Sequence, residues 1–373
     1  MPINDISCTL PFEQAVVRTD GKISPCCIII GTQNIKNTSL GEYWKNARSI
    51  NIRNQIAEGT TPLDVGCQYC YKDDASGLPS MRANSLANIN KQQYDIMVDN
   101  RDQSSYPKRL EFHVSNICNL KCLTCRPEDS SLFLTEDRIL KISDHNQMDY
   151  QIDENLIADT IEDALNNKIE YIDLRGGETL MVPVIKKMLA RIPTEVCKQV
   201  DIRFQTNATL IDNEWIDIFN KFRNTYIHLS IDGYGEKNNY IRFPSKWDQI
   251  DRNVDNLIKN KKISVTTYVL CTVSNLNLLC LHELIKWTRS KMIPFYWSRL
   301  YNPPHYSPSN MPIDLFNLAK EQLSTFKEFN GLTNIEHNDS EWQNFCDMIT
   351  IRDTHRKNSI FDCVPEFRQY WTK

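Results

Sequence analysis

Apolar runs of strand length alternate with segments of helical periodicity through the middle of the chain. Six β-rich runs follow Arg109, and they span residues 110–114, 171–174, 200–205, 226–231, 263–269 and 294–299. Amphipathic segments lie between them, near residues 154–166, 182–190, 213–222, 247–259 and 279–289. Strand, helix and strand in this repetition favour right-handed parallel crossovers. The pattern predicts an α/β fold with a partial (β/α)6 TIM-like barrel, and an open doubly wound sheet is the alternative.

The first hundred residues follow a different pattern. Short strand-like runs at 14–18 and 27–30 are separated by turn signals, and helical spacing fits residues 40–58. A polar stretch at 100–108 reads as a linker, and Pro-rich turns after Tyr301 precede a helix near residues 314–326. We therefore predict a small irregular domain (1–106), the barrel (107–301) and a C-terminal extension (302–373).

Charge and hydropathy give no indication of a nucleic-acid-binding or membrane-spanning protein. The 43 basic and 47 acidic side chains leave a net charge of -4, which gives no reason to expect a nucleic acid or an anionic membrane as partner. Apolar runs fall short of the roughly 18 residues of a spanning helix. The first twenty residues contain Asp5 and Glu13 and lack an apolar signal core. We expect a cytoplasmic protein.

Cysteine usage is unusual for such a chain. There are 13 cysteines, and they concentrate in the first third of the sequence. A reducing compartment keeps thiols available, so clustered cysteines indicate metal ligands rather than disulfides. The clustered residues are Cys8, Cys26, Cys27, Cys67, Cys70, Cys118, Cys122 and Cys125.

The strongest motif is the C-x3-C-x2-C run of Cys118, Cys122 and Cys125, which directly follows the first predicted barrel strand. Three thiolates on one loop can hold three corners of an iron–sulfur cluster and leave the fourth iron open for a chelating molecule. Loops after the carboxyl ends of strands carry the active sites of (β/α) barrels. A zinc knuckle with a fourth ligand from elsewhere, or three unrelated core cysteines, are the alternatives.

This run, with Arg175-Gly176-Gly177-Glu178 at the second strand and Ser230-Ile231-Asp232-Gly233 followed by Arg242, resembles the radical S-adenosylmethionine (SAM) enzymes. The resemblance implies that the three cysteines hold a [4Fe-4S] cluster, that SAM chelates its open iron, and that reduction releases a 5′-deoxyadenosyl radical. A departure from the family is Thr124, where an aromatic residue near adenine is usual.

The resemblance also implies a set of SAM-binding residues. The glycines of Gly-Gly-Glu let the backbone approach the methionyl amino group, and the carboxylate accepts hydrogen bonds from it. Taken alone, Gly-Gly-Glu could be a simple turn and Arg242 a helix cap. The candidate residues are Gly176, Gly177, Glu178, Ser230, Arg242 and Asn207.

The N-terminal cysteines resemble those of a twitch domain, the shortened relative of the SPASM domain, although such domains usually follow the barrel. The resemblance implies one auxiliary [4Fe-4S] cluster, and a structural zinc is the alternative. Gly21 fits the turn of a hairpin between the first two ligands. Cys27 adjoins Cys26, but neighbouring side chains on a strand face opposite ways, so only one should reach the metal. The four candidate ligands are Cys8, Cys26, Cys67 and Cys70.

Taken together, these features predict a radical SAM enzyme that abstracts hydrogen from a peptide or small-molecule substrate. Its electron donor would be a flavodoxin or a ferredoxin. The hypothesis from another class is a zinc-stabilised binding protein without catalysis.

Overall fold

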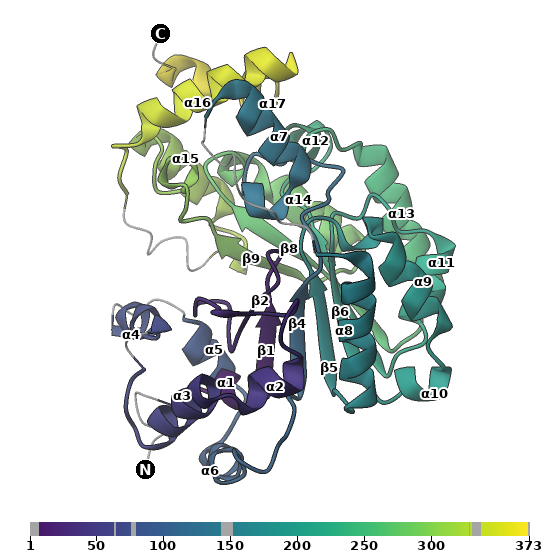
Figure 1. Ribbon diagram of the computed structural model, residues 1–373. Helices are drawn as coiled ribbons and strands as arrows, with labels where there is room; N and C mark the ends of the chain where they lie inside the picture. Colours follow the sequence, from purple (N-terminus) through teal and green to yellow (C-terminus); the bar gives the residue numbers. More distant parts are fainter. Residues whose placement is uncertain are drawn as a thin grey trace. The chain divides into compact units, whose positions relative to one another are not determined.

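The computed structural model describes residues 7–62, 65–75, 80–142, 152–327, 329 and 337–371. Its strands follow the order β3-β2-β1-β4-β5-β6-β7-β8-β9 in a mixed sheet (Figure 1). The strands are β1 (Gln14–Val17), β2 (Lys22–Ser24), β3 (Gln33–Asn34), β4 (Arg109–His113), β5 (Tyr171–Arg175), β6 (Asp201–Thr206), β7 (Asn224–Ser230), β8 (Val265–Val273) and β9 (Phe295–Arg299).

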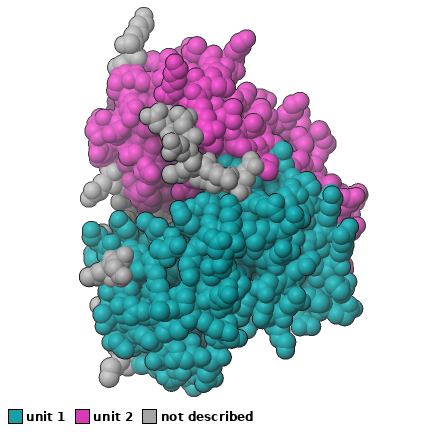
Figure 2. Space-filling view, in the orientation of Figure 1, with its two compact units in different colours: residues 1–116, 148–203, 221–224 teal, residues 117–147, 204–220, 225–373 magenta. Residues whose placement is uncertain are grey.

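The chain divides into two compact units, which Figure 2 distinguishes by colour. Unit 1 comprises Met1–Asn116, Met148–Arg203 and Lys221–Asn224. Unit 2 comprises Ile117–Gln147, Phe204–Asn220 and Thr225–Lys373.

In unit 1, β1 pairs antiparallel with β2 and parallel with β4, and β4 pairs parallel with β5. Side chains along β4 and β5 alternate between faces, as the strand period requires. Leu110 and Phe112 are fully buried, and they lie in register with Ile172 and Leu174. The opposite face of the same strands carries charged side chains. The helices of unit 1 are α1 (Leu10–Glu13), α2 (Leu40–Lys45), α3 (Ala47–Ala57), α4 (Gln68–Ala75), α5 (Met81–Leu86), α6 (Lys91–Asp99), α8 (Glu154–Asn166), α9 (Pro183–Arg191) and α10 (Thr194–Cys197).

In unit 2, β7, β8 and β9 pair in parallel. The apolar stripe of α13 (Trp247–Asn260) shows how the connecting helices pack, because Trp247, Ile250, Val254 and Leu257 recur at helical spacing and are buried. The other helices of unit 2 are α7 (Ser131–Leu140), α11 (Asn213–Phe219), α12 (Glu236–Ile241), α14 (Leu281–Ser290), α15 (Ile313–Leu323), α16 (Trp342–Arg356) and α17 (Ile360–Cys363). None of the helices in the described part of the chain has the length and apolar character needed to cross a bilayer.

The six predicted strands and the α/β class are confirmed, with strand ends shifted by a few residues. Two N-terminal predictions are wrong. Residues 27–29 form bends rather than a strand. Side chains take the carbonyls that a strand partner would use there, because the Ser24 hydroxyl donates to the Cys26 carbonyl at 2.9 Å and the Arg18 guanidinium donates to the Cys27 carbonyl. The predicted helix at 40–58 is two helices, because Asn46 is extended and its side chain caps α3 by accepting from the Ser49 amide. The domain limits proposed from the sequence stay a prediction.

Candidate functional site

The loop after β4 carries Cys118, Cys122 and Cys125 within unit 2. Cys118 and Cys122 are buried, Cys125 is half-buried, and all three pack together with Leu120. The Leu120 amide donates to the Cys118 sulfur at 3.4 Å, and the Cys125 amide donates to the Cys122 carbonyl at 3.1 Å. These local bonds fold the loop on itself, so the three cysteines of the C-x3-C-x2-C run pack in one cluster.

The chain just after α12 holds this loop. The Lys121 amide donates to the Phe243 carbonyl at 2.7 Å, and the Leu123 amide donates to the Ile241 carbonyl at 2.8 Å. Arg242 lies between these two acceptors, and its Nη1 is 3.9 Å from the Cys122 sulfur. The loop backbone is therefore fixed on both sides of the central cysteine.

Arg242 is anchored by a fully buried carboxylate. Its Nη2 lies 2.8 Å from Oδ2 of Asp232, and Oδ1 of Asp232 accepts from the Thr272 amide at 2.7 Å. Asp232 was part of the Ser-Ile-Asp-Gly motif but received no role from sequence reasoning. Its position two residues after the end of β7, directly after the predicted run 226–231, was the available signal. A buried cation held beside a thiol favours the thiolate form.

Burial governs the protonation of the loop thiols. It raises the pKa of Cys122, although Arg242 opposes the rise. It raises the pKa of Cys125 further, and the neighbouring Cys122 adds to the effect. Such thiols give up their protons when a metal takes the place of the proton. Three soft sulfur donors on one folded loop fit a [4Fe-4S] cluster with one corner free of protein ligands.

The Gly-Gly-Glu segment follows β5 in unit 1. Gly176 and Gly177 have φ values of +92° and +37°, a region that side chains rarely adopt. A Cβ on Gly176 would lie 2.6 Å from the Ser115 carbonyl oxygen. Glu178 is buried, and its carboxylate accepts from the Leu180 amide at 3.1 Å. The glycines are required by backbone geometry, and contact of these residues with SAM stays a prediction.

Ser230 and Asn207 both lie in unit 2. Ser230 ends β7, and its hydroxyl accepts from Nε2 of the Gln205 side chain at 3.4 Å. Asn207 donates to Oδ1 of Asn119 at 2.9 Å, and its own Oδ1 accepts from Thr209. Because Asn119 lies in the cysteine loop, the hydrogen bond from Asn207 stabilises the position of that loop. A direct contact of either residue with SAM also stays a prediction.

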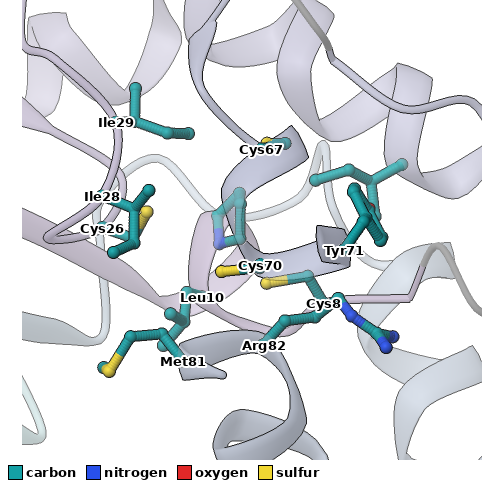
Figure 3. Close-up of a pocket in the computed structure, with 12 residues that line it drawn as sticks. Cys8, Leu10, Cys26, Ile28, Ile29, Cys67, Cys70, Tyr71, Met81 and Arg82 are labelled. Atoms are coloured by element: carbon teal, nitrogen blue, oxygen red, sulfur yellow. The ribbon is translucent and has the colours of Figure 1, made fainter. Parts of the chain in front are cut away.

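The four N-terminal cysteines surround one cavity in unit 1 (Figure 3). Its empty space is about 410 Å³, open mouth included, and apolar side chains such as Ile29 and Ile56 line the rest. No three His, Cys, Asp or Glu side chains of the described residues converge closely enough to hold a single metal ion. The sulfurs thus stand around a space rather than at a point. The four cysteines are Cys8, Cys26, Cys67 and Cys70.

The chain places these cysteines by simple local means. Gly21, with φ +78°, turns the β1–β2 hairpin as predicted and leads to Cys26. Cys67 and Cys70 stand at the start of α4. Burial raises the pKa of Cys8 to about 12 and that of Cys26 to about 11. Both thiols are therefore protonated in the absence of a metal and become thiolates when they bind one. Four soft donors around an apolar cavity fit an iron–sulfur cluster with all corners held by protein.

Cys27 does not line this cavity. Its thiol lies near Glu111, Cys26, Arg175 and Arg18, and burial raises its pKa to about 12. Cys26 therefore lines the cavity and Cys27 does not, and the local backbone is bent rather than extended. That only one of the two reaches a metal stays a prediction.

Comparisons with known proteins match two segments. The radical SAM superfamily model matches residues 112–287, and an iron–sulfur cluster-binding domain model, SPASM, matches residues 8–71. Among curated proteins, molybdenum cofactor biosynthesis protein 1 of Dictyostelium discoideum is 22% identical over 299 residues. The match covers 76% of this chain and 43% of that protein, so the chain spans less than half of the relative.

Matches to solved structures are weaker, as two of them show. Native anSMEcpe with bound AdoMet is 20% identical, with 62% of each chain covered and a TM-score of 0.44. SuiB of Streptococcus suis bound to S-adenosylmethionine is 15% identical, with 71% of this chain and 60% of that chain covered and a TM-score of 0.42. The two matched segments of the preceding comparison contain all seven cysteines that the sequence singled out as ligands.

Proposed function

We propose, on the premise that the chain belongs to the radical SAM superfamily and carries an N-terminal SPASM domain, that it cleaves SAM reductively to abstract hydrogen from a peptide substrate. The observation that carries this proposal is the folded loop in which Cys118 and Cys122 are buried and the half-buried Cys125 packs against them. A [4Fe-4S] cluster held by these three cysteines would supply the electron that breaks the sulfonium C–S bond of SAM. The products would be methionine and a 5′-deoxyadenosyl radical, which would take a hydrogen atom from the substrate and become 5′-deoxyadenosine. A reduced flavodoxin or ferredoxin is the proposed electron source.

The residues of the chain bind and orient SAM in this proposal. The backbone of Gly176 and Gly177 approaches the methionyl amino group, and the Glu178 carboxylate accepts from it. Ser230 binds the ribose of SAM. Arg242 binds the SAM carboxylate. It also stabilises the thiolate of Cys122, because its Nη1 lies 3.9 Å from that sulfur.

The N-terminal cavity holds an auxiliary cluster in this proposal. Four cysteine ligands leave it no open iron, so it transfers electrons or positions substrate instead of cleaving SAM. The apolar lining contributed by Ile28, Ile29 and Ile56 keeps water from the sulfurs.

The polar sheet faces support a hydrogen-bonding substrate. In unit 1, Glu111 lies 2.9 Å from His113 Nε2 and 3.6 Å from Arg175, and Arg175 lies 2.6 Å from Asp173. In unit 2, the rings of His228, Tyr268 and Tyr296 pack in series. Charged and hydroxyl groups on such faces suit amides and side chains of a peptide better than an apolar molecule. A polar small molecule is the second candidate, on the same observation.

Anaerobic purification and product analysis test the proposal. We expect about eight irons and eight sulfides per chain, as two cubane clusters require, and formation of 5′-deoxyadenosine from SAM after reduction. Cys122→Ala should abolish 5′-deoxyadenosine formation. Cys197→Ala removes a buried thiol outside both groups and is the matched control, which should retain it. Colourless protein that contains zinc and leaves SAM intact would support the zinc-stabilised binding protein and refute the enzyme.

A further inference from the structure

Two buried arginines of α16 belong to an ion-pair network that reaches the cysteine loop. Helix α16 lies outside both matched segments, in the C-terminal extension. Arg352 and Arg356 are one helical turn apart, and their side chains are only 3% and 0% exposed. Buried guanidinium groups persist only where carboxylates or carbonyls satisfy their donors. Their partners therefore show what the helix is fixed to.

Arg356 donates directly to the backbone of the loop. Its Nη2 lies 2.8 Å from the carbonyl oxygen of Lys121, the residue that precedes Cys122. The Nε of the same group donates to Oε1 of Glu136 on α7 at 2.9 Å, and Glu136 Oε1 pairs with Nζ of Lys121 at 2.7 Å. Three parts of unit 2 thus meet at one carboxylate: the loop, the helix that follows it and α16.

Arg352 joins the same network without contacting the loop. Its two terminal nitrogens lie 2.8 Å from Glu136 and 2.6 Å from Asp137, both on α7. Burial alone would raise the pKa of Glu136, but Arg356 and Lys121 outweigh burial and hold it at about 2. The network is therefore ionised, and its geometry is fixed by charge-assisted hydrogen bonds.

Helix α16 also fixes the segment on the other side of the loop. The hydroxyl of Tyr240 donates to Oδ1 of Asp353 at 2.8 Å, and Oδ2 of Asp353 accepts from the Ile360 amide. Tyr240 directly precedes the residues whose carbonyls accept the amides of Lys121 and Leu123. The same helix thus supports both chain segments between which Cys122 is held.

We propose that Arg356 is a positioning residue of the radical SAM reaction, acting through the Lys121 carbonyl to fix the backbone that carries Cys122. This inference rests on the proposed function. Ligand placement and hydrogen bonding around the sulfurs set the properties of an iron–sulfur cluster. A planar guanidinium can donate hydrogen bonds to the Glu136 carboxylate and the Lys121 carbonyl at the same time. A lysine ammonium is a point charge on a flexible stem and does not hold both acceptors in one fixed geometry.

Matched lysine variants of the two arginines test the inference. Arg356→Lys keeps the positive charge opposite Glu136 and removes the guanidinium that donates to the Lys121 carbonyl. Arg352→Lys removes a guanidinium of the same helix that forms ion pairs with residues of α7 and does not contact the loop. Hydrogen–deuterium exchange of residues 117–126 should accelerate by about tenfold or more in Arg356→Lys, as loss of one charge-assisted bond predicts. Exchange there should stay within about twofold of the wild type in Arg352→Lys. Equal exchange in the two variants, or unchanged exchange in Arg356→Lys, would overturn the inference.

The spectrum of the bound cluster gives a second readout. In reduced protein, the electron paramagnetic resonance signal that responds to SAM should change its shape in Arg356→Lys and keep the wild-type shape in Arg352→Lys. A SAM-responsive wild type with an unaltered Arg356→Lys signal refutes the positioning role and leaves the proposed function standing. A wild-type protein that binds no iron refutes both.

Discussion

Substituting alanine for Gly176 tests whether the Gly-Gly-Glu turn is as tightly built as its geometry indicates. At φ +92° an alanine costs about 1–2 kcal/mol, because its Cβ crowds the following carbonyl. The new Cβ would also lie 2.6 Å from the Ser115 carbonyl oxygen and 3.2 Å from the His113 carbonyl carbon. Both are backbone atoms, so relief requires movement of the chain at the end of β4, which costs about 1–3 kcal/mol. The expected loss is about 2–5 kcal/mol in the free energy of unfolding.

Gly235→Ala is the matched control. Gly235 also has positive φ, +61°, but a Cβ there meets no atom within 4 Å, so only the conformational cost of about 1–2 kcal/mol applies. Urea unfolding followed by circular dichroism measures both variants, and equilibrium dialysis measures SAM affinity. We expect Gly176→Ala to lose more stability than the control and to bind SAM about tenfold or more weakly. Equal stability losses in the two variants, with SAM affinity intact, would refute the reasoning.

The remaining predictions concern the two cysteine groups, the buried carboxylate and the loop support. Cys67→Ala should spare 5′-deoxyadenosine formation yet impair substrate turnover, and equal loss of both in Cys67→Ala and Cys122→Ala would contradict separate cluster roles. Because the folded pKa of Glu136, about 2, lies below its ordinary value, its stabilisation is present above about pH 4.5 and is lost as pH falls toward 2. Acid titration of the wild type should lose about 3 kcal/mol from this group, and Glu136→Gln should flatten that dependence; parallel pH profiles would contradict it. Asn207→Ala removes the bond to Asn119 and should speed iron release to a chelator several-fold, whereas unchanged release would argue against loop support.

Much of the fold followed from local sequence. The strands that carry Leu110, Phe112, Ile172 and Leu174 were found because apolar side chains alternate with polar ones along them, which is typical of a strand with one face in the core. The N-terminal errors arose where side chains compete with the regular backbone, as Arg18 does for the Cys27 carbonyl and Asn46 does for the Ser49 amide. Parallel pairing of β1 with β4 joins residues almost a hundred positions apart, and no local pattern encodes it.

The site divides in the same way. The cysteines were predicted from spacing, since a loop of eight residues fixes which sulfurs can meet. Arg356 was missed because its loop contact, Lys121, lies 235 residues away in the sequence and carries no motif. Long-range ion pairs between buried groups depend on tertiary packing that periodicity does not report.

The central claim is that the sulfurs of one short loop leave an iron accessible to SAM. Electron paramagnetic resonance of anaerobically reduced protein, recorded before and after SAM is added, tests this directly. We expect two reduced iron–sulfur signals in the wild type, one of which shifts with SAM, and loss of the shifting signal in Cys122→Ala. Signals that are identical with and without SAM would contradict it.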